Sequence, residues 1–377
     1  RSIVSEELAE IVNKFGDERR TTIVADENDV THEDLIAEEP IVVTLSADGY
    51  IKRTKAALYR SQKRGGRGVK GAALKQDDVV TNFFVTTTHH WILFFTDRGR
   101  VFRVKAYELT DTGRDARGQH VANLLSLAPE EHVVEVLDLR DYEQAKYLVL
   151  ATHNGVIKKS RLADYDSSRS TGLVAITLRD EDGVVSAQLV DDEDDLLLVS
   201  KMGYSVRCHA DDATLRPMGR TAGGVIGIRF KTEDDYLLKM EVATADSFVV
   251  TVTEGGWAKR TSIEEWNAKG RGTQGVRAMR LVEKRGGLAG ALICAAEDEI
   301  FAIASNGVVI RTRVDEIRAA GRDTMGVSFM KVGDEDKVVA VARSTAAAMA
   351  ALESVEIPVT QQDTEAADDT VTEVEEV

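Results

Sequence analysis

The chain has 377 residues with 43% hydrophobic content and only four prolines, which excludes collagen-like and largely disordered chains and allows a sizeable core. Two cysteines, Cys208 and Cys294, are too few for a disulfide framework, so we expect a reducing, cytoplasmic setting. The formal net charge is −16, and the apolar runs are too short to span a bilayer, so we expect no membrane partner.

The first predicted element is a helix near the start of the chain. Apolar residues recur at helical spacing from Val4 to Phe15, and Gly16 provides a C-terminal stop. We interpret residues 1–40 as the end of an upstream helical core followed by a linker.

An acidic stretch follows this helix. Asp29, Thr31 and Glu33 occupy alternate positions, as in the first half of a Ca²⁺-binding loop. Asp34 and Pro40 replace the Gly and Glu that such a loop carries at its sixth and twelfth positions. The alternative is a helix-capping pair formed by Thr31 and Asp34. Ca²⁺ is therefore one of two interpretations of this stretch.

A basic, glycine-rich segment comes next. Residues 59–71 read YRSQKRGGRGVKG, and residues 49–75 contain nine basic residues and no acidic one. Glycines permit close backbone approach and expose amide groups, while Lys63, Arg64 and Arg67 neutralise phosphates. The segment therefore predicts a phosphate-backbone clamp, and a solvated flexible loop is the alternative.

Six similar segments recur from residue 41 to residue 343. In each, an apolar strand runs into a tight turn that ends in Gly, which predicts a β-hairpin. Each repeat continues with an Arg followed, usually four positions later, by Gly, and then with a further apolar strand. Four short strands per repeat predict an all-β fold, a six-bladed propeller-like ring of four-stranded blades, over residues 41–343.

A basic residue stands four positions after each turn glycine. The series is Arg53, Arg103, Lys159, Arg207, Arg260 and Arg311. Together with Lys52 and Arg271, these residues predict a basic rim that binds nucleic acid. The alternative is charge that protects strand edges from pairing.

The last predicted segment is an acidic tail over residues 344–377. It has nine acidic residues and no Lys or Arg, and we expect it to be disordered.

One motif and the repeat carry a family resemblance. The motif, QKRGGRG, comprises Gln62, Lys63, Arg64, Gly65, Gly66, Arg67 and Gly68. It resembles the box Q-[RK]-R-G-G-[RK]-G of the DNA gyrase A-subunit family. The six repeats are similar to the β-pinwheel of that family's C-terminal domain, and FGDERRT at residues 15–21 resembles the junction with its breakage-reunion core.

The resemblance implies a function in DNA topology. DNA would bend around the basic edge, and the box, residues 62–68, would complete the wrap. The holoenzyme, with two A and two B subunits, ATP and Mg²⁺, would then introduce negative supercoils. The cleavage tyrosine and the ATPase part lie outside this chain, so we expect no cofactor and no catalytic residue in it.

Two alternatives stay open beside this interpretation. The first is the C-terminal domain of topoisomerase IV, a family that lacks an intact box. The second is a propeller that binds protein partners. Within the main interpretation, residues 269–275, KGRGTQG, are a degraded box or an auxiliary DNA contact.

Overall fold

The computed structural model describes residues 2–17, 32–58, 80–113, 116–179, 181–306, 308–333 and 335–344. The chain divides into two units, residues 1–37 and 38–377. The first unit contains the helix α1 (Ser2–Phe15), which confirms the predicted N-terminal helix, and a 3₁₀ turn, η1 (Glu33–Leu35). None of the described helices is long and apolar enough to cross a membrane.

Each repeat of the second unit begins with a β-hairpin. The hairpins are β1 (Pro40–Ser46) with β2 (Tyr50–Lys55), β4 (Trp91–Thr96) with β5 (Arg100–Lys105), β8 (Tyr147–Thr152) with β9 (Val156–Arg161), β12 (Asp195–Ser200) with β13 (Tyr204–His209), β16 (Phe248–Thr253) with β17 (Trp257–Ser262), and β20 (Glu299–Ala304) with β21 (Val309–Arg313). We number the repeats 1 to 6 by these hairpins. The first strand of each hairpin is mostly buried, because its residues pack on both faces of the sheet.

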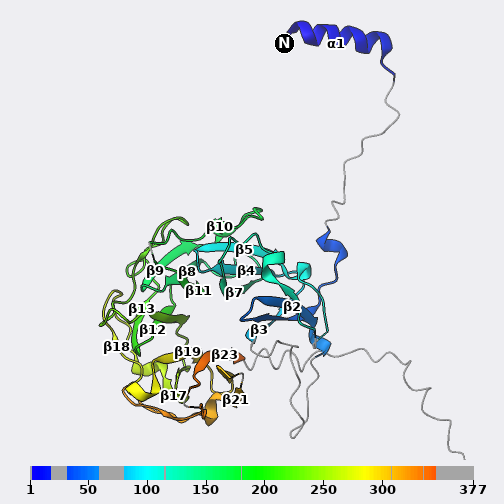
Figure 1. The fold of residues 1–377 in the computed structure, drawn as a ribbon. Helices are drawn as coiled ribbons and strands as arrows, with labels where there is room; N and C mark the ends of the chain where they lie inside the picture. Colours follow the sequence, from blue (N-terminus) through cyan, green and yellow to red (C-terminus); the bar gives the residue numbers. More distant parts are fainter. Residues whose placement is uncertain are drawn as a thin grey trace, which may run out of the picture. The chain divides into compact units, whose positions relative to one another are not determined.

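An inner strand pairs with the first strand of each hairpin. The inner strands are β3 (Val80–Thr87), β7 (Val133–Leu139), β11 (Val184–Val190), β15 (Leu237–Val242), β19 (Leu288–Cys294) and β23 (Val338–Ser344). The inner strands of repeats 2 to 6 pack against one another in succession, from β7 to β23, and β23 packs against β3. The six sheets therefore form a ring with the inner strands at its centre (Figure 1), which confirms the predicted six-bladed fold.

The fourth strand of a sheet comes from the following repeat. These short strands are β6 (Gln119–His120), β10 (Leu173–Val174), β14 (Val225–Ile226), β18 (Val276–Arg277) and β22 (Val327–Ser328). For example, β6 of repeat 2 pairs with β2 of repeat 1, and β22 of repeat 6 pairs with β17 of repeat 5. Within the described residues the sixth sheet has three strands, in the order β21-β20-β23.

Short 3₁₀ turns complete the repeats. They are η2 (Ala56–Leu58), η3 (Ala106–Glu108), η4 (Val121–Asn123), η5 (Leu162–Tyr165), η6 (Ile263–Glu265), η7 (Glu283–Arg285) and η8 (Val314–Glu316). The main hydrophobic clusters lie between neighbouring blades. One of them joins Val149 and Ile157 of repeat 3 to Leu196 and Leu198 of repeat 4. Burial of apolar surface therefore stabilises pairs of repeats rather than single ones.

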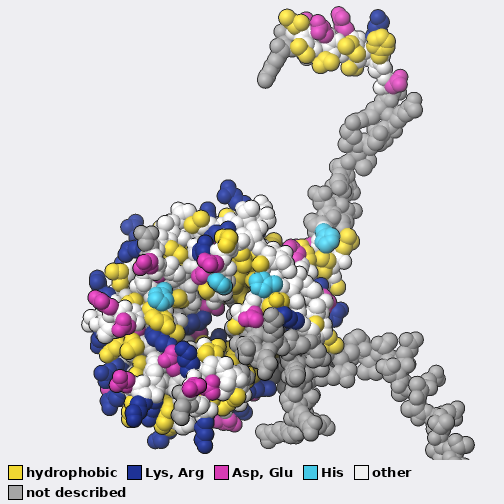
Figure 2. All heavy atoms as spheres, in the orientation of Figure 1, with side chains coloured by type: hydrophobic (Ala, Val, Ile, Leu, Met, Phe, Trp, Pro, Cys, Tyr) yellow, Lys and Arg dark blue, Asp and Glu magenta, His cyan; other side chains and the backbone are white. Residues whose placement is uncertain are grey.

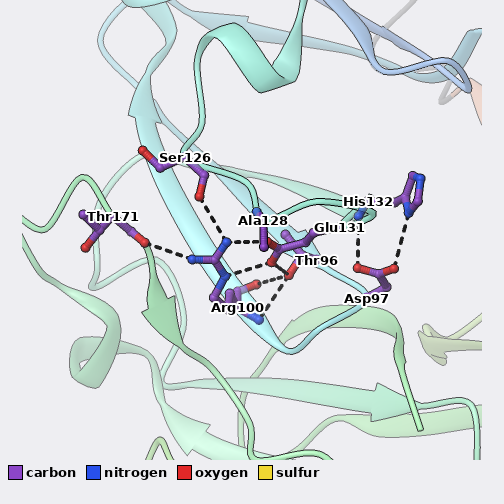
Figure 3. Close-up of polar contacts among 8 residues, drawn as sticks. All are labelled: Thr96, Asp97, Arg100, Ser126, Ala128, Glu131, His132 and Thr171. Atoms are coloured by element: carbon purple, nitrogen blue, oxygen red, sulfur yellow. Dashed lines mark hydrogen bonds and ion pairs between the residues drawn. The ribbon is translucent and has the colours of Figure 1, made fainter. Parts of the chain in front are cut away.

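A buried carboxylate joins three loops of repeats 2 and 3 (Figure 3). Arg100 donates from Nε to Oε1 of Glu131 at 2.8 Å, and its Nη1 and Nη2 donate to the carbonyl oxygens of Thr171 and Ser126. Glu131 also accepts a hydrogen bond of 2.6 Å from Oγ1 of Thr96. Burial alone would raise the pKa of Glu131, but the hydrogen bonds from Arg100 and Thr96 outweigh it and lower the pKa to about 2.

The substitution Glu131→Gln tests this carboxylate. Because its pKa is lower in the folded chain, its contribution to stability is complete above the unfolded pKa of about 4.3 and is lost as the pH falls towards 2. At pH 7 we expect the variant to lose roughly 3 kcal/mol of unfolding free energy. Urea denaturation between pH 2 and pH 7 should show a flatter pH dependence for the variant.

The exposed neighbour Glu130 provides the matched control. Glu130→Gln should preserve the pH dependence of the unmodified chain. Parallel stability curves for Glu131→Gln and the unmodified chain would show that this ion pair does not determine the acid sensitivity.

Gly275 shows why the second glycine of each repeat is needed. It lies directly before β18, has a φ of 64°, and a Cβ there would lie 2.1 Å from the carbonyl oxygen of Ser205 on β13. Any larger residue would therefore push the incoming fourth strand away from the sheet that it completes.

The substitution Gly275→Ala should lower the unfolding free energy by about 3 kcal/mol through strain and overpacking. Gly270→Ala, five residues earlier, is the control, because a Cβ at Gly270 meets no atom within 4 Å. Thermal and urea denaturation of the two variants should differ clearly. Equal stability would mean that the strand exchange tolerates a side chain at this crossing.

Candidate nucleic-acid interface

The outer edge of the ring consists of the short fourth strands and the loops that lead into them. We call these loops the rim loops: residues 109–118, 166–172, 210–224, 267–275 and 318–326. Their described basic residues are Arg117, Arg169, Arg216, Arg220, Lys269, Arg271, Arg318 and Arg322. Just after the fourth strands β14 and β18, Arg229 and Arg280 add further cations. Lys and Arg side chains lie around much of the visible periphery of the ring (Figure 2).

The rim loops also carry Asp111, Asp166, Asp211, Asp212 and Asp323, and runs of acidic residues lie in other loops. The acidic run DDEDD comprises the loop residues 191–194 between β11 and β12 and Asp195 at the start of β12, and the loop before β15 carries Glu233, Asp234 and Asp235. The first loop connects an inner strand to the next hairpin and so lies at a face of the ring, whereas the second runs from the fourth strand β14 at the outer edge to the inner strand β15. The negative net charge is therefore compatible with a basic rim.

In repeats 1, 4 and 5 the basic residue that follows the turn glycine joins one blade to the next. Nε of Arg53 donates to the carbonyl oxygen of Leu109 at 2.9 Å, and Nε of Arg260 donates to that of Ile317 at 2.9 Å. Nη1 of Arg207 donates to the carbonyl oxygen of Trp266 at 3.0 Å. Each acceptor ends a 3₁₀ turn of the following repeat. This structural role accounts for the basic residue in repeats 1, 4 and 5, whereas Arg311 of repeat 6 pairs with Glu299 of its own hairpin.

Two of the predicted rim lysines are not on the surface. Lys159 is fully buried, and its Nζ donates to Oδ1 of Asp212 at 2.8 Å and to the carbonyl oxygen of Ala210 at 2.5 Å. Lys52 is 1% exposed, and its Nζ donates to the carbonyl oxygen of Ala116 at 2.8 Å. Both ammonium groups are buried and hold backbone of the next repeat, and contact of these two lysines with DNA stays a prediction.

The other predicted rim residues differ in exposure. Arg103 packs over Trp91 at 4.2 Å and donates to Oδ1 of Asp166 at 2.6 Å. Arg271 and Arg311 are exposed. Arg271 donates from Nε to the carbonyl oxygen of Thr214 at 2.8 Å, which links two rim loops. Contact of these residues with DNA stays a prediction.

A recess of about 340 Å³ lies where the box-like stretch 269–275 meets β13. Arg207, Lys269 and Arg322 contribute cations to its lining, and Glu265 contributes a carboxylate. Its lining also includes Trp266, whose Nε1 donates to Oγ of Ser205 at 2.7 Å. The recess thus places cations from repeats 4, 5 and 6 around one concave part of the rim.

Several predicted sites lie outside the described residues. The box, residues 62–68, is one of them, and so are Asp29 and Thr31 of the acidic stretch. Glu33 begins the turn η1. Among the residues that the structure describes, no group of three His, Cys, Asp or Glu side chains is arranged to hold a metal. The Ca²⁺ interpretation therefore stays a prediction.

Sequence reasoning missed part of the basic surface. It did not single out Arg216, Arg229, Arg280 or Arg318, which lie outside the repeated positions. These four residues lie close to the recurring Arg and Gly of each repeat, and this position was the available signal. The segments that contain that Arg and Gly supply the outermost strands. Only the exchange of strands between repeats shows that these segments form the outer edge.

Comparison with protein families gives a match over all six repeats. A family described as "DNA gyrase C-terminal domain, beta-propeller" matches residues 40–87, 90–138, 146–191, 194–244, 247–295 and 298–345. These bounds follow the six blades closely.

Similar curated proteins are named as the A subunit of DNA gyrase. The chain is 56% identical over 352 residues to the protein from Streptomyces coelicolor, covering 92% of this chain and 41% of that protein. It is 54% identical over 344 residues to the protein from Mycobacterium tuberculosis strain H37Rv, covering 91% of this chain and 41% of that protein. The chain thus spans less than half the length of these relatives.

Two solved structures share the fold. A crystal structure of the C-terminal domain of DNA topoisomerase IV matches with a TM-score of 0.70 and 28% identity, covering 84% of this chain and 98% of that chain. A structure of the DNA gyrase A C-terminal domain matches with a TM-score of 0.66 and 25% identity, covering 81% of this chain and 99% of that chain.

Proposed function

The chain belongs to the family of DNA gyrase C-terminal domains with a β-propeller fold, and from this premise we propose that it binds duplex DNA and wraps it around its rim. One observation carries the proposal: basic residues line the rim loops of a chain whose net charge is −16. Such a distribution attracts a polyanion to one edge and repels it from the acidic faces.

The kind of contact follows from the rim's composition. Arg and Lys side chains spread over several blades suit phosphate groups, which recur along the duplex regardless of sequence. A curved row of such contacts favours DNA that bends, so sequence preference arises from deformability rather than from base contacts. Binding should therefore be strong, sensitive to salt and weakly dependent on sequence.

The wider context belongs to the proposal too. In it, this chain is the wrapping part of the gyrase A subunit, which works in the cytoplasm in an assembly of two A and two B subunits. ATP hydrolysis, Mg²⁺ and DNA cleavage belong to other parts of that assembly, and this chain contributes no catalytic residue. Wrapping presents a crossing segment of one hand, which directs strand passage towards negative supercoils.

The C-terminal domain of topoisomerase IV is the second candidate. The structural similarity at a TM-score of 0.70 favours it. Identity of 54–56% to proteins named as the A subunit of DNA gyrase, over more than 90% of the chain, favours gyrase. The intact sequence QKRGGRG at residues 62–68 supports the gyrase assignment as well.

The first prediction concerns salt. The logarithm of the DNA association constant should fall linearly with the logarithm of salt concentration, with a slope of about −0.9 per phosphate neutralised. Arg169→Ala, which removes an exposed rim cation, should make the slope less steep by about 1. Fluorescence anisotropy with duplex DNA at several salt concentrations measures both.

Arg140→Ala is the control for this series. Arg140 is also exposed, but it pairs with Asp141 in the loop between β7 and β8, at a face of the ring. Its removal should leave the slope unchanged. An affinity that does not respond to a several-fold change in salt would contradict the wrapping proposal and favour a propeller that binds protein partners.

The second prediction concerns the box. Replacing residues 62–68 by alanines should preserve most of the affinity, because the rim loops of the other repeats still offer cations. The completed wrap should be lost. Ligation of a nicked circle around the chain should trap a linking difference with the unmodified protein and little with the variant. In the assembled enzyme, supercoiling should fail while relaxation continues.

Replacement of Lys269 and Arg271 by alanines, which keeps Gly275 and the strand β18 that follows it, separates the box from the box-like stretch. If the box completes the wrap, the second variant should trap more linking difference than the first. An unchanged linking difference in the variant of residues 62–68 would refute the role given to the box.

A further inference from the structure

One position of the hairpin alternates between two kinds of residue around the ring. It precedes the recurring basic residue by one position and holds Lys52, Lys158 and Lys259 in repeats 1, 3 and 5. In repeats 2, 4 and 6 it holds Phe102, Val206 and Ile310. Lys158 and Lys259 are fully buried, although they stand on the outer strand of their hairpins.

The ammonium group of Lys259 holds a rim loop from inside the protein. Its Nζ donates to the carbonyl oxygen of Gly321 at 2.7 Å and to that of Arg322. Both acceptors belong to the rim loop 318–326 of repeat 6. Arg322, whose backbone is held in this way, also lines the recess described above.

Lys158 occupies the equivalent place two repeats earlier. Its Nζ donates to the carbonyl oxygens of Ala175 and Arg220 and to the hydroxyl of Tyr165 at 3.2 Å. Arg220 belongs to the rim loop 210–224 of repeat 4. Its guanidinium donates to the carbonyl oxygen of Val174 at 2.6 Å, so the loop is fixed from both sides.

Within the described part of the chain, the hydrogen-bond partners of the two ammonium groups are carbonyl oxygens and the hydroxyl of Tyr165, and no carboxylate lies at ion-pair distance from either. The charged and titratable groups that face Lys158 are Tyr165, Arg220 and Asp164, and those that face Lys259 are Glu265, Asp323 and Arg322. Burial lowers the pKa of Lys158 to about 7 and that of Lys259 to about 8. A buried cation without a counter-ion costs stability.

Repeats 2, 4 and 6 show that the fold does not require a buried lysine at this position. Val206 fills the same position in repeat 4 and is buried, and the following strand β18 still pairs with β13. An apolar residue of similar volume would therefore serve packing as well. The two lysines persist at a position where the fold itself accepts an apolar residue.

We propose that Lys158 and Lys259 are positioning residues for DNA phosphates. Each holds the inner side of one rim loop and places beneath it an ammonium group that donates to backbone carbonyl oxygens and, among the described residues, has no carboxylate at ion-pair distance. A phosphate on the outer side of that loop supplies the missing counter-charge. This inference rests on the proposed function, because it specifies how two alternate loops of the rim receive the duplex.

Proton linkage follows from this arrangement. A phosphate near the loop stabilises the charged form of the lysine, so DNA binding raises its pKa. At pH 8 a part of these groups is neutral in the free chain, and binding then takes up protons. Affinity should consequently fall as the pH rises from about 7 to 9, by up to tenfold per group and pH unit.

Isothermal calorimetry with a linear duplex long enough to encircle the ring tests this directly. Binding enthalpies at pH 8 in two buffers with different ionisation enthalpies should differ and show net proton uptake for the unmodified chain. The double variant Lys158→Met, Lys259→Met should lose the uptake, flatten the pH dependence of affinity and bind roughly tenfold more weakly at pH 7.

Lys146→Met is the matched control, since Lys146 is exposed and pairs with Asp192 at a face of the ring. It should leave proton uptake unchanged. If the methionine variant unfolds, Lys259→Val, which copies the residue of repeat 4, and the calorimetry of the unmodified chain still decide the question.

The outcomes separate the two proposals. An unmodified chain that does not bind DNA refutes the proposed function. Binding without proton uptake at pH 8 refutes the inference alone. Variants that bind more weakly but keep the same uptake and pH profile also overturn it, because they assign these lysines a structural role only.

Discussion

The exchange of one strand between successive repeats is the constraint on which the rest of this structure depends. Because β6, β10, β14, β18 and β22 complete the sheet of the preceding repeat, no blade of the first five is complete within its own segment. The hydrophobic clusters follow the same pattern, since each main cluster joins two neighbouring blades. Hydrogen bonds such as those from Arg53 to Leu109 and from Arg260 to Ile317 add a polar joint at the same junctions. Folding of one repeat therefore depends on its neighbour, as in other repeat proteins.

The hairpins and the number of blades could be predicted from the sequence, because both are local. A turn such as that at Gly203 needs a positive φ, and the apolar runs beside it mark the two strands. The exchange was not predictable, because the fourth strands are only two residues long and carry no alternation of their own. The backbone partners of the basic residue after each turn were not predictable for a related reason. A sequence shows that a cation recurs, but carbonyl oxygens and phosphate oxygens both accept hydrogen bonds from it, and only the fold shows which carbonyl oxygens lie within its reach.

The same ambiguity applies to Lys159 and Arg271, which lie in different places in the fold. Lys159 donates to Asp212 and to a backbone carbonyl oxygen in the interior, so the basic residue at this position helps to join two blades. Arg271 has the same type of backbone acceptor, yet it lies at the exposed edge. The distinction between them depends on where the chain places the rim loops, and this is set by strand exchange. The basic rim is thus a consequence of the same constraint that joins the blades, because the exchanged segments become the outermost part of the sheets that they complete.

The alternation of Lys and apolar residues beneath the rim loops makes the charge of the rim differ from blade to blade. A ring of six similar blades would present six similar edges, but repeats 3 and 5 place an ammonium group beneath the loop that follows, whereas repeats 2 and 4 place Phe102 and Val206 there. Cations at the surface are screened by solvent and cost little, while a buried one is costly and acts over a longer range in a low dielectric. In the proposed wrap, a duplex that bends along the rim would therefore meet a potential that varies from blade to blade. Such variation would favour particular positions of the duplex over continuous sliding, without any contact to a base.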